Sequence, residues 1–309
     1  RDPVASVTVG GATTYYADFA EAWGATNSAT GAVTLKLLQD VSGITTSLAY
    51  TNAQNCTLDL NTHTLSGTVS KLIDVNASGK IFTIDDSSTA KGGRISLSRS
   101  TNGRIYGIYI TAGTVKLEHG TIYCKNTSTG SSAGATAVYV TVTQTFTMED
   151  GAVESESRTS SFAIYASDAG TTTITINGGL VKGHTNYGKT AIGIYTKAKG
   201  LTVNGGKIIG HAWTNTSYGI YLYGGSATLN GGIIEATNDT ISNNGTTTAY
   251  GIYVRYSSST YKAVLTIPST STVVVLAKAR TNTAFAVVVS ASSTGSLDRK
   301  SGSAGMPRP

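Results

Sequence analysis

A short run of alternating side chains recurs along the chain and organises it. The clearest copy is 249–254, Ala-Tyr-Gly-Ile-Tyr-Val, and related copies place a tyrosine at intervals of about 26 to 32 residues. Alternate side chains of a strand face opposite ways, so each copy predicts a strand with an aliphatic residue in the core and a tyrosine outside. The predicted outward column consists of Tyr109, Tyr139, Tyr165, Tyr195, Tyr221 and Tyr253.

Each tyrosine strand is followed by two shorter apolar and polar alternations, which predict two further strands per repeat. The first ends in a turn of the Asn-Gly-Gly kind, as in Leu201 to Gly206 (Leu-Thr-Val-Asn-Gly-Gly). The second carries an inward aliphatic residue and, two positions later, a small one. Small residues at one inward position predict a corner at which backbones come close. These small residues are Cys124, Ser155, Gly183, Gly210 and Ala236.

A repeat of three short strands is typical of a parallel β-helix. Over about residues 33–290 the chain resembles the right-handed parallel β-helix (pectate-lyase-like) superfamily, through its repeat pattern and not through an enzyme motif. We therefore predict an all-β protein, a single right-handed parallel β-helix (β-solenoid) of about nine coils with a short N-terminal capping helix. The predicted regions are 1–30 (N-terminal strand and capping helix), 31–295 (parallel β-helix) and 296–309 (C-terminal tail).

The N-terminal region carries the one convincing helical pattern. Apolar residues at i, i+3, i+4 and i+7 predict a helix over 15–23, with Thr13 or Thr14 as its N-cap and Gly24 at its end. The first coil of a solenoid exposes its apolar interior. We therefore expect this helix to cover that end.

The stretch from Cys56 to Gly67 resembles the start of β-helical regions in large secreted or wall-associated bacterial proteins. The shared feature is the run Leu-Asp-Leu-Asn-Thr-His-Thr-Leu, in which Thr62 stands where the pattern usually has Gly. This resemblance implies a strand pair around a turn. It also implies an extracellular or cell-surface location.

Composition and charge narrow the setting. Charged residues make up 13% of the chain, and the 39% of hydrophobic residues are spread at period two. No run approaches the ~18 apolar residues of a membrane helix, so we expect no membrane span. The net charge of +6 comes from scattered Lys and Arg without a basic helix or an RNA-binding motif, so we expect no nucleic-acid partner.

The two cysteines, Cys56 and Cys124, occupy inward positions about two coils apart, at a distance beyond the ~7 Å that a disulfide allows between Cα atoms. We therefore expect buried free thiols. The stability of the predicted solenoid then depends on its stacked strands and not on a cross-link.

Two pairs of carboxylates are candidates for chemistry. Asp85 and Asp86 resemble the paired acids of polysaccharide hydrolases of this fold, but the other hydrolase motifs are absent. A polar turn with side-chain to backbone hydrogen bonds is the favoured interpretation of this pair. Glu118 and Glu149 lie on successive outward rungs without an adjacent third ligand for calcium, and we interpret them as solvated surface residues.

Two histidines are the remaining candidates. His184 and His211 each follow a glycine in equivalent places and are expected to stack, but two imidazoles without a third ligand make a poor zinc site. No catalytic serine elbow and no nucleotide-binding glycine loop is present in the sequence. We therefore expect no catalytic residue, no metal site and no cofactor.

The column of tyrosines has two interpretations. In the first, stacked identical residues simply fill the surface of a parallel solenoid. In the second, a column of small residues runs beside the tyrosines on the same outward face and forms a furrow with an aromatic wall. Such a furrow suits a sugar chain, a peptide or another solenoid. Its small residues include Gly193, Gly219 and Gly251.

The function expected from these patterns is that of a non-catalytic extracellular structural or adhesive protein, which acts through repeated surface contacts. An open last coil presents unpaired strand edges, so head-to-tail self-association into filaments is one form of this function, with 1–9 or 296–309 across the subunit boundary. The expected partners are further copies of the chain or a surface glycan. The alternative is a polysaccharide-binding or polysaccharide-degrading β-helix protein, a lyase or a hydrolase.

Overall fold

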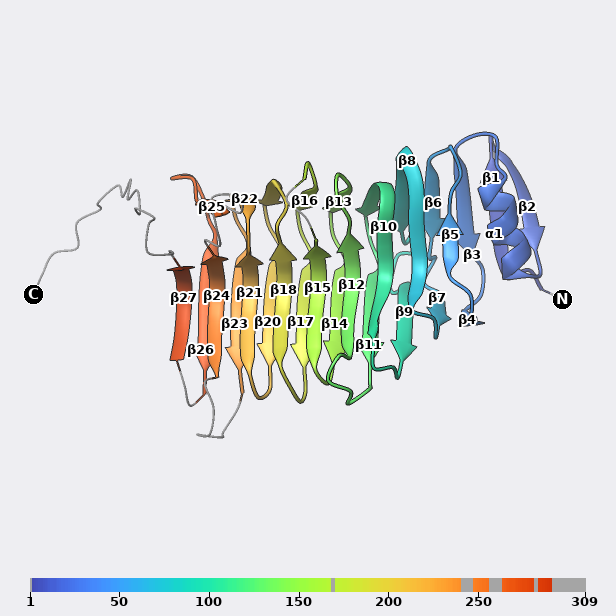
Figure 1. The fold of residues 1–309 in the computed structure, drawn as a ribbon. Helices are drawn as coiled ribbons and strands as arrows, with labels where there is room; N and C mark the ends of the chain where they lie inside the picture. The colour runs from blue at the N-terminus through green and yellow to red at the C-terminus, as the bar shows by residue number, and fades with distance from the viewer. Residues whose placement is uncertain (1, 168–169, 240–246, 256–262, 281–282, 291–309) are drawn as a thin grey trace, which may run out of the picture.

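The protein is a parallel β-solenoid of about seven turns with one helix near its N-terminus. The computed structural model describes residues 2–167, 170–239, 247–255, 263–280 and 283–290. The strands lie one turn after another between the two ends of the molecule (Figure 1). We expected about nine coils. The structure has about seven turns. One of its sheets does contain nine strands, but this number includes the strands of the end turns, and the pairing of the first two strands is interrupted by a register shift. The predicted tail, 296–309, lies outside the described residues.

One sheet of eighteen strands contains the tyrosine strands and the strands that follow them. The two longest strands, β8 and β10, bend from one part of the turn into the next and pair with both series. The tyrosine series comprises β5 (Leu48–Tyr50), β8 (Lys71–Asp85), β10 (Arg104–Leu117), β12 (Gly134–Val140), β15 (Ser160–Ala166), β18 (Thr190–Thr196), β21 (Thr216–Leu222), β24 (Thr248–Arg255) and β27 (Thr283–Ser290). The second series adds β3 (Val33–Leu37), β6 (Cys56–Asp59), β13 (Thr145–Met148), β16 (Thr173–Ile176), β19 (Gly200–Val203), β22 (Gly225–Leu229) and β25 (Ala263–Thr266).

The third strand of each turn lies in a separate sheet of nine strands. The small inward residues of this sheet confirm the predicted corner, because a Cβ atom at Gly210 would collide with the carbonyl oxygen of Tyr218. The same collision would occur between Gly183 and Ile192. The strands are β4 (Val41–Ile44), β7 (Thr64–Gly67), β9 (Arg94–Arg99), β11 (Thr121–Asn126), β14 (Ala152–Ser157), β17 (Leu180–Thr185), β20 (Lys207–Ala212), β23 (Ile233–Asn238) and β26 (Val274–Ala279).

The core is built from columns of equivalent aliphatic side chains. Val138 pairs in register with Ile108 on one side and Ile164 on the other, and the column continues through Ile194 to Ile252. All of these side chains are fully or almost fully buried. The predicted inward register of the tyrosine strands is therefore confirmed. Both cysteines are buried free thiols, also as predicted.

The N-terminal prediction is correct about the cap and wrong about its boundaries. Residues 12–16 form β2 (Ala12–Tyr16), which pairs with β1 (Ala5–Val9) in an antiparallel hairpin. The helix α1 (Phe19–Asn27) begins later, because the side chain of Asp18 accepts hydrogen bonds from the backbone N–H groups of Ala20 and Glu21. The hairpin is possible because the two glycines at its turn adopt positive φ.

The helix covers the first coil, as expected. The indole of Trp23 is buried, and its centroid lies 6.4 Å from the rings of both Tyr50 and Phe82. Gly24 does not end the helix, which continues for one more turn and places Thr26 in the interior. In the described part of the chain no helix is both long and apolar enough to cross a lipid bilayer.

We predict that the Ile194→Asp variant is already unfolded at ambient temperature and shows no cooperative unfolding transition on heating. The substitution places an unpaired charge in a stacked aliphatic column, at a cost of at least about 4 kcal/mol. Thr202→Asp, at an outward position of β19, is the matched control and is expected to change stability by less than about 1 kcal/mol. Circular dichroism melting curves of both variants check the register. Wild-type melting of the Ile194 variant would contradict it.

Candidate functional site

The predicted tyrosines form a continuous stack on the outside of the solenoid. Their ring centroids lie 4.6 to 5.3 Å apart from one turn to the next, and the planes of the first four rings are within 14° of parallel. Parallel strand pairing produces this stack because it places equivalent residues directly above one another. We call it the tyrosine column, and it consists of Tyr109, Tyr139, Tyr165, Tyr195, Tyr221 and Tyr253.

A second column of outward residues lies beside the first, three positions earlier in each strand. Its aromatic members contact the tyrosine column edge to face: the Tyr106 and Tyr109 rings are 5.2 Å apart at 88°, and the Tyr218 and Tyr221 rings are 4.9 Å apart at 77°. Such T-shaped pairs are favourable for aromatic rings. Sequence analysis missed this column. We call the tyrosine column together with Tyr106, Phe162, Tyr218 and Tyr250 the aromatic face.

The predicted furrow of small residues is wrong. Cβ atoms at Gly193 and Gly219 would meet the buried side chains of Ile208 and Ile234, and a Cβ atom at Gly251 would meet that of Val275. These glycines therefore face the core. The strands keep the same register on both sides of the glycine, but the glycine is not among the paired residues, and the glycine and the isoleucine that follows it are both buried. This local irregularity moves the outward position from the glycine to the residue before it.

Cationic side chains lie on the aromatic face. The ammonium of Lys71 is 3.6 Å from the centroid of Tyr109, and the guanidinium of Arg104 is 4.5 Å from that of Phe162. At the other end Arg255 lies 4.7 Å from the ring of Tyr223 and donates a hydrogen bond to the hydroxyl of Tyr221. Such contacts are cation–π interactions. They hold each cation close to an aromatic ring.

The aromatic face carries almost no negative charge. No Asp or Glu occurs within β10, β12, β15, β18, β21 or β24. Asp74 of β8 lies in register with Tyr109, at the N-terminal end of the column. It pairs with Lys71 at 3.4 Å and accepts a hydrogen bond from the hydroxyl of Thr111. The face is therefore aromatic, cationic and rich in hydroxyl groups.

Several phenols of this face have a raised pKa. Burial raises the pKa of Tyr106, Tyr165 and Tyr195 above the ordinary value for tyrosine, and neighbouring phenols raise it further. Each therefore keeps a hydroxyl that can both donate and accept a hydrogen bond. Because the rings stack on one another, ring edges and hydroxyl groups are what the column offers to a partner.

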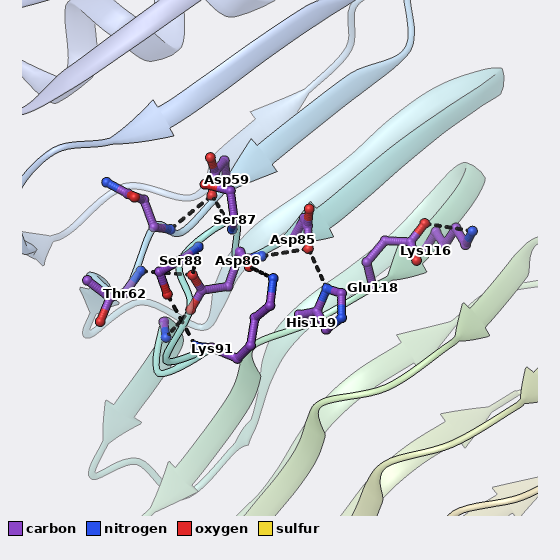
Figure 2. A network of polar contacts seen from close by, with 12 residues as sticks. Asp59, Thr62, Asp85, Asp86, Ser87, Ser88, Lys91, Lys116, Glu118 and His119 are labelled. Carbon is purple, nitrogen blue, oxygen red and sulfur yellow. Dashed lines mark hydrogen bonds and ion pairs between the residues drawn. The ribbon is translucent and has the colours of Figure 1, made fainter.

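Asp85 and Asp86 lie in a polar turn, as the sequence predicted (Figure 2). The side chain of Asp86 is fully buried and accepts hydrogen bonds from the backbone N–H groups of Thr62, Ser88 and Gly93. Burial acts to raise the pKa of Asp86, but these hydrogen bonds outweigh it and lower the pKa below its usual value. Asp86 is thus a structural anion that holds this loop to the preceding turn, where Thr62 adopts a φ of 69°.

The remaining carboxylates of this region are also engaged. Asp85 lies 2.8 Å from Nδ1 of His119 (Figure 2). Lys116 bridges Glu118 at 2.6 Å and Glu149 at 3.3 Å. Glu118 and Glu149 thus share one lysine at the surface of the solenoid.

Glu149 begins a column of amide hydrogen bonds at the Asn-Gly-Gly turns. Asn177 donates to Glu149, Asn204 donates to Asn177, and Asn230 donates to Asn204, each at 2.7 Å. The repeated asparagine therefore links the turns along the solenoid. Its role is structural.

The two histidines stack as predicted, with centroids 4.8 Å apart. His211 also lies 2.6 Å from a carboxylate oxygen of Asp239. Within the described ranges no three His, Cys, Asp or Glu side chains gather in a way that would hold a metal ion.

Comparison with known proteins gives no relative: no family model, no curated protein and no solved structure matches the chain. The parallel β-solenoid is therefore established by the structure of this chain itself. The resemblance to the pectate-lyase-like superfamily and to bacterial surface proteins stays a prediction.

The histidine stack generates a prediction of pH dependence. Burial lowers the pKa of His184 below its ordinary value of 6.5, and the neighbouring His211 and Lys182 lower it further, against smaller opposing effects of Glu156 and Asp239. Below about pH 6.5 the unfolded chain then binds more protons at this position than the folded chain does, so stability falls as the pH falls.

We expect His184→Gln to flatten the decline in unfolding free energy between about pH 6.5 and 5, because no group remains at this position to take up a proton. Urea unfolding of wild type and variant across this range is the measurement. Identical pH profiles of the two proteins would contradict the prediction.

Proposed function

We propose that the protein is a non-catalytic structural or adhesive β-solenoid of the cell exterior, and that it binds through its aromatic face. The observation that carries this proposal is the uninterrupted tyrosine column on six successive turns, with Lys71, Arg104 and Arg255 held against aromatic rings. A repeated surface on a rod offers one contact per turn to an extended partner. Many weak contacts then add to a stable one.

The chemistry of the face favours a surface glycan as the partner. A row of phenol hydroxyls matches a polymer that carries hydroxyl groups along its length, and the rings supply apolar contact area. The arginines match acidic groups on such a polymer, since a guanidinium stacked on a ring keeps its N–H edge for a carboxylate or sulfate. A partner of this kind is an extended glycan that carries some negative charge.

The alternative, a polysaccharide lyase or hydrolase, requires carboxylates that are positioned on either side of a substrate bond. The candidate carboxylates are engaged otherwise: Asp86 holds backbone N–H groups, Asp85 contacts His119, and Glu149 is bound by Lys116 and Asn177. This arrangement supports the non-catalytic proposal.

We predict that the double variant Tyr195→Ala with Tyr221→Ala loses binding to extended acidic glycans. It is expected to lose only about 2–5 kcal/mol of stability, because both phenols are partly exposed and the stacked core beneath them is unchanged. Co-sedimentation with insoluble cell-wall polysaccharide and calorimetric titration with soluble fragments measure the effect. Tyr16→Ala, at the end of β2, is the matched control for a lost partly buried tyrosine.

Retained glycan binding in the double variant would leave the tyrosine column with a structural role only. If the wild-type protein binds neither acidic nor neutral glycans, the proposal that its partner is a glycan is wrong. The control variant is expected to bind as the wild type does.

A second candidate function, end-to-end assembly, is favoured by the C-terminal end of the described solenoid. Phe285, Val287 and Val289 of β27 are each more than 40% exposed.

At the other end β2 runs in the same direction as the solenoid strands, because β2 and β3 are both antiparallel to β1. Its outer edge can thus accept a parallel strand of another copy.

For this candidate we predict concentration-dependent rods that lengthen in electron micrographs. Val287→Lys combined with Val289→Lys is expected to keep the protein in single rods, because the charges oppose burial of the end. The matched control places lysines at Thr175 and Thr202, which are outward positions in mid-solenoid. A wild-type protein that sediments as a monomer at high concentration would rule out assembly.

A further inference from the structure

Two exposed aromatic side chains lie away from the aromatic face, on loops that join the nine-stranded sheet to the tyrosine strands. Tyr187 lies between β17 and β18 and is 65% exposed, and Trp213 lies between β20 and β21 and is 51% exposed. The two loops belong to adjacent turns, since the backbone N–H of Trp213 donates to the carbonyl of Thr185. Unlike the stacked tyrosines, these rings present most of their surface to solvent.

The loop that carries Tyr187 is held firmly by its neighbours. The N–H of Gly188 donates to the hydroxyl of Thr214 at 3.0 Å, and the N–H of Lys189 donates to the carbonyl of Thr159 at 2.8 Å. Gly188 has a φ of 136°, and a Cβ atom there would collide with the backbone of Arg158. The ring of Tyr187 therefore projects from a fixed backbone, which lowers the entropy cost of binding.

A polar hollow adjoins this ring. It is lined by residues of β11 and β14 and of the loops that follow β11, β14 and β17, including Lys125, Glu156, Arg158, Asn186 and Tyr187. Glu156 accepts hydrogen bonds from Tyr123 at 2.8 Å and from Asn186 at 2.9 Å, and it pairs with Lys125 at 3.1 Å. Arg158 lies 5.7 Å from the centroid of Tyr187.

The charges in the hollow are fixed. Burial acts to raise the pKa of Glu156, but the hydrogen bonds from Asn186, Tyr123 and Lys125 outweigh it and lower the pKa to about 2. Glu156 is therefore ionised at any physiological pH. The hollow thus offers both an anionic acceptor and cationic donors beside an exposed ring.

We propose that this hollow is a binding site for a single neutral sugar residue, which stacks on the ring of Tyr187. A pyranose has an apolar face of C–H groups that suits an exposed aromatic ring, and hydroxyl groups that both donate and accept hydrogen bonds. Asn186 and Glu156 supply acceptors, and Lys125 and Arg158 supply donors.

Other ligand classes fit the hollow less well. A phosphate or a polyanion gains little from Lys125, whose charge is already paired with Glu156 at 3.1 Å, and the ionised Glu156 opposes a second negative charge beside Arg158. A purely apolar ligand would leave Lys125, Glu156 and Asn186 without the hydrogen bonds that water gives them. The site does not depend on the aromatic face being a binding surface, and it can be tested separately.

The experiment is saturation-transfer NMR with the full chain and methyl glycosides of glucose, galactose and N-acetylglucosamine, followed by titration with the best of these. We expect saturation transfer to the C–H groups on one face of the sugar. Tyr187→Ala is expected to weaken binding about tenfold or more, and Tyr187→Trp to preserve it. Because the side chain of Tyr187 is exposed, both variants are expected to melt as the wild type does.

Tyr15→Ala, on β2 and as exposed as Tyr187, is the matched control and is expected to leave monosaccharide binding unchanged. Absence of transfer to every neutral glycoside at millimolar concentration would overturn the proposal, as would unchanged affinity in Tyr187→Ala. Loss of monosaccharide binding in Tyr221→Ala would also overturn it, since the sugar would then bind the aromatic face. Loss of polymer binding on the aromatic face, with monosaccharide binding intact, would leave this site standing while the proposed function fails.

Discussion

Parallel backbone pairing between successive turns is the interaction on which this structure depends. It brings equivalent residues of neighbouring turns into register, so each position of the repeat becomes a column along the rod. Inside, the columns are aliphatic and fully buried, and at one corner they are small because the backbones approach closely. A residue type that occupies one position of the repeat therefore recurs from turn to turn, whether its role is packing, hydrogen bonding or recognition.

The outer columns differ in chemistry from one side of the solenoid to the other. The nine-stranded sheet pairs its charges, as between Lys207 and Glu235 at 2.8 Å. The asparagine turns form a chain of amide hydrogen bonds. The aromatic face instead holds its arginines against rings without a carboxylate in the same strands, which leaves their charge available to a partner. This difference between faces is why the proposed adhesive function is assigned to one of them.

The two ends of the described solenoid are unequal for a related reason. A stacked core has no natural end, because the last turn always exposes the side chains that the next turn would cover. At the N-terminal end a hairpin and α1 cover the first coil, with Trp23 packed on Tyr50 and Phe82. At the last described strand the equivalent positions are open. The exposed valines of β27 are the physical basis of the proposed end-to-end assembly.

The sequence by itself determined the solenoid, the inward isoleucines, the tyrosine column, the free cysteines, the Asp85–Asp86 turn and the histidine stack. All of these follow from period-two alternation and from a repeat that parallel pairing converts directly into neighbours. Only the tertiary structure decided that Gly193 and Gly219 face the core, because two successive inward residues interrupt the period-two alternation on which the prediction rested. The second aromatic column depends on that same irregularity. The start of α1 has a local signal, the N-cap Asp18, but residues 15 and 16 belong to β2 because β2 pairs with β1. The hollow beside Tyr187 is set by contacts between different turns, for which the local pattern carries no signal.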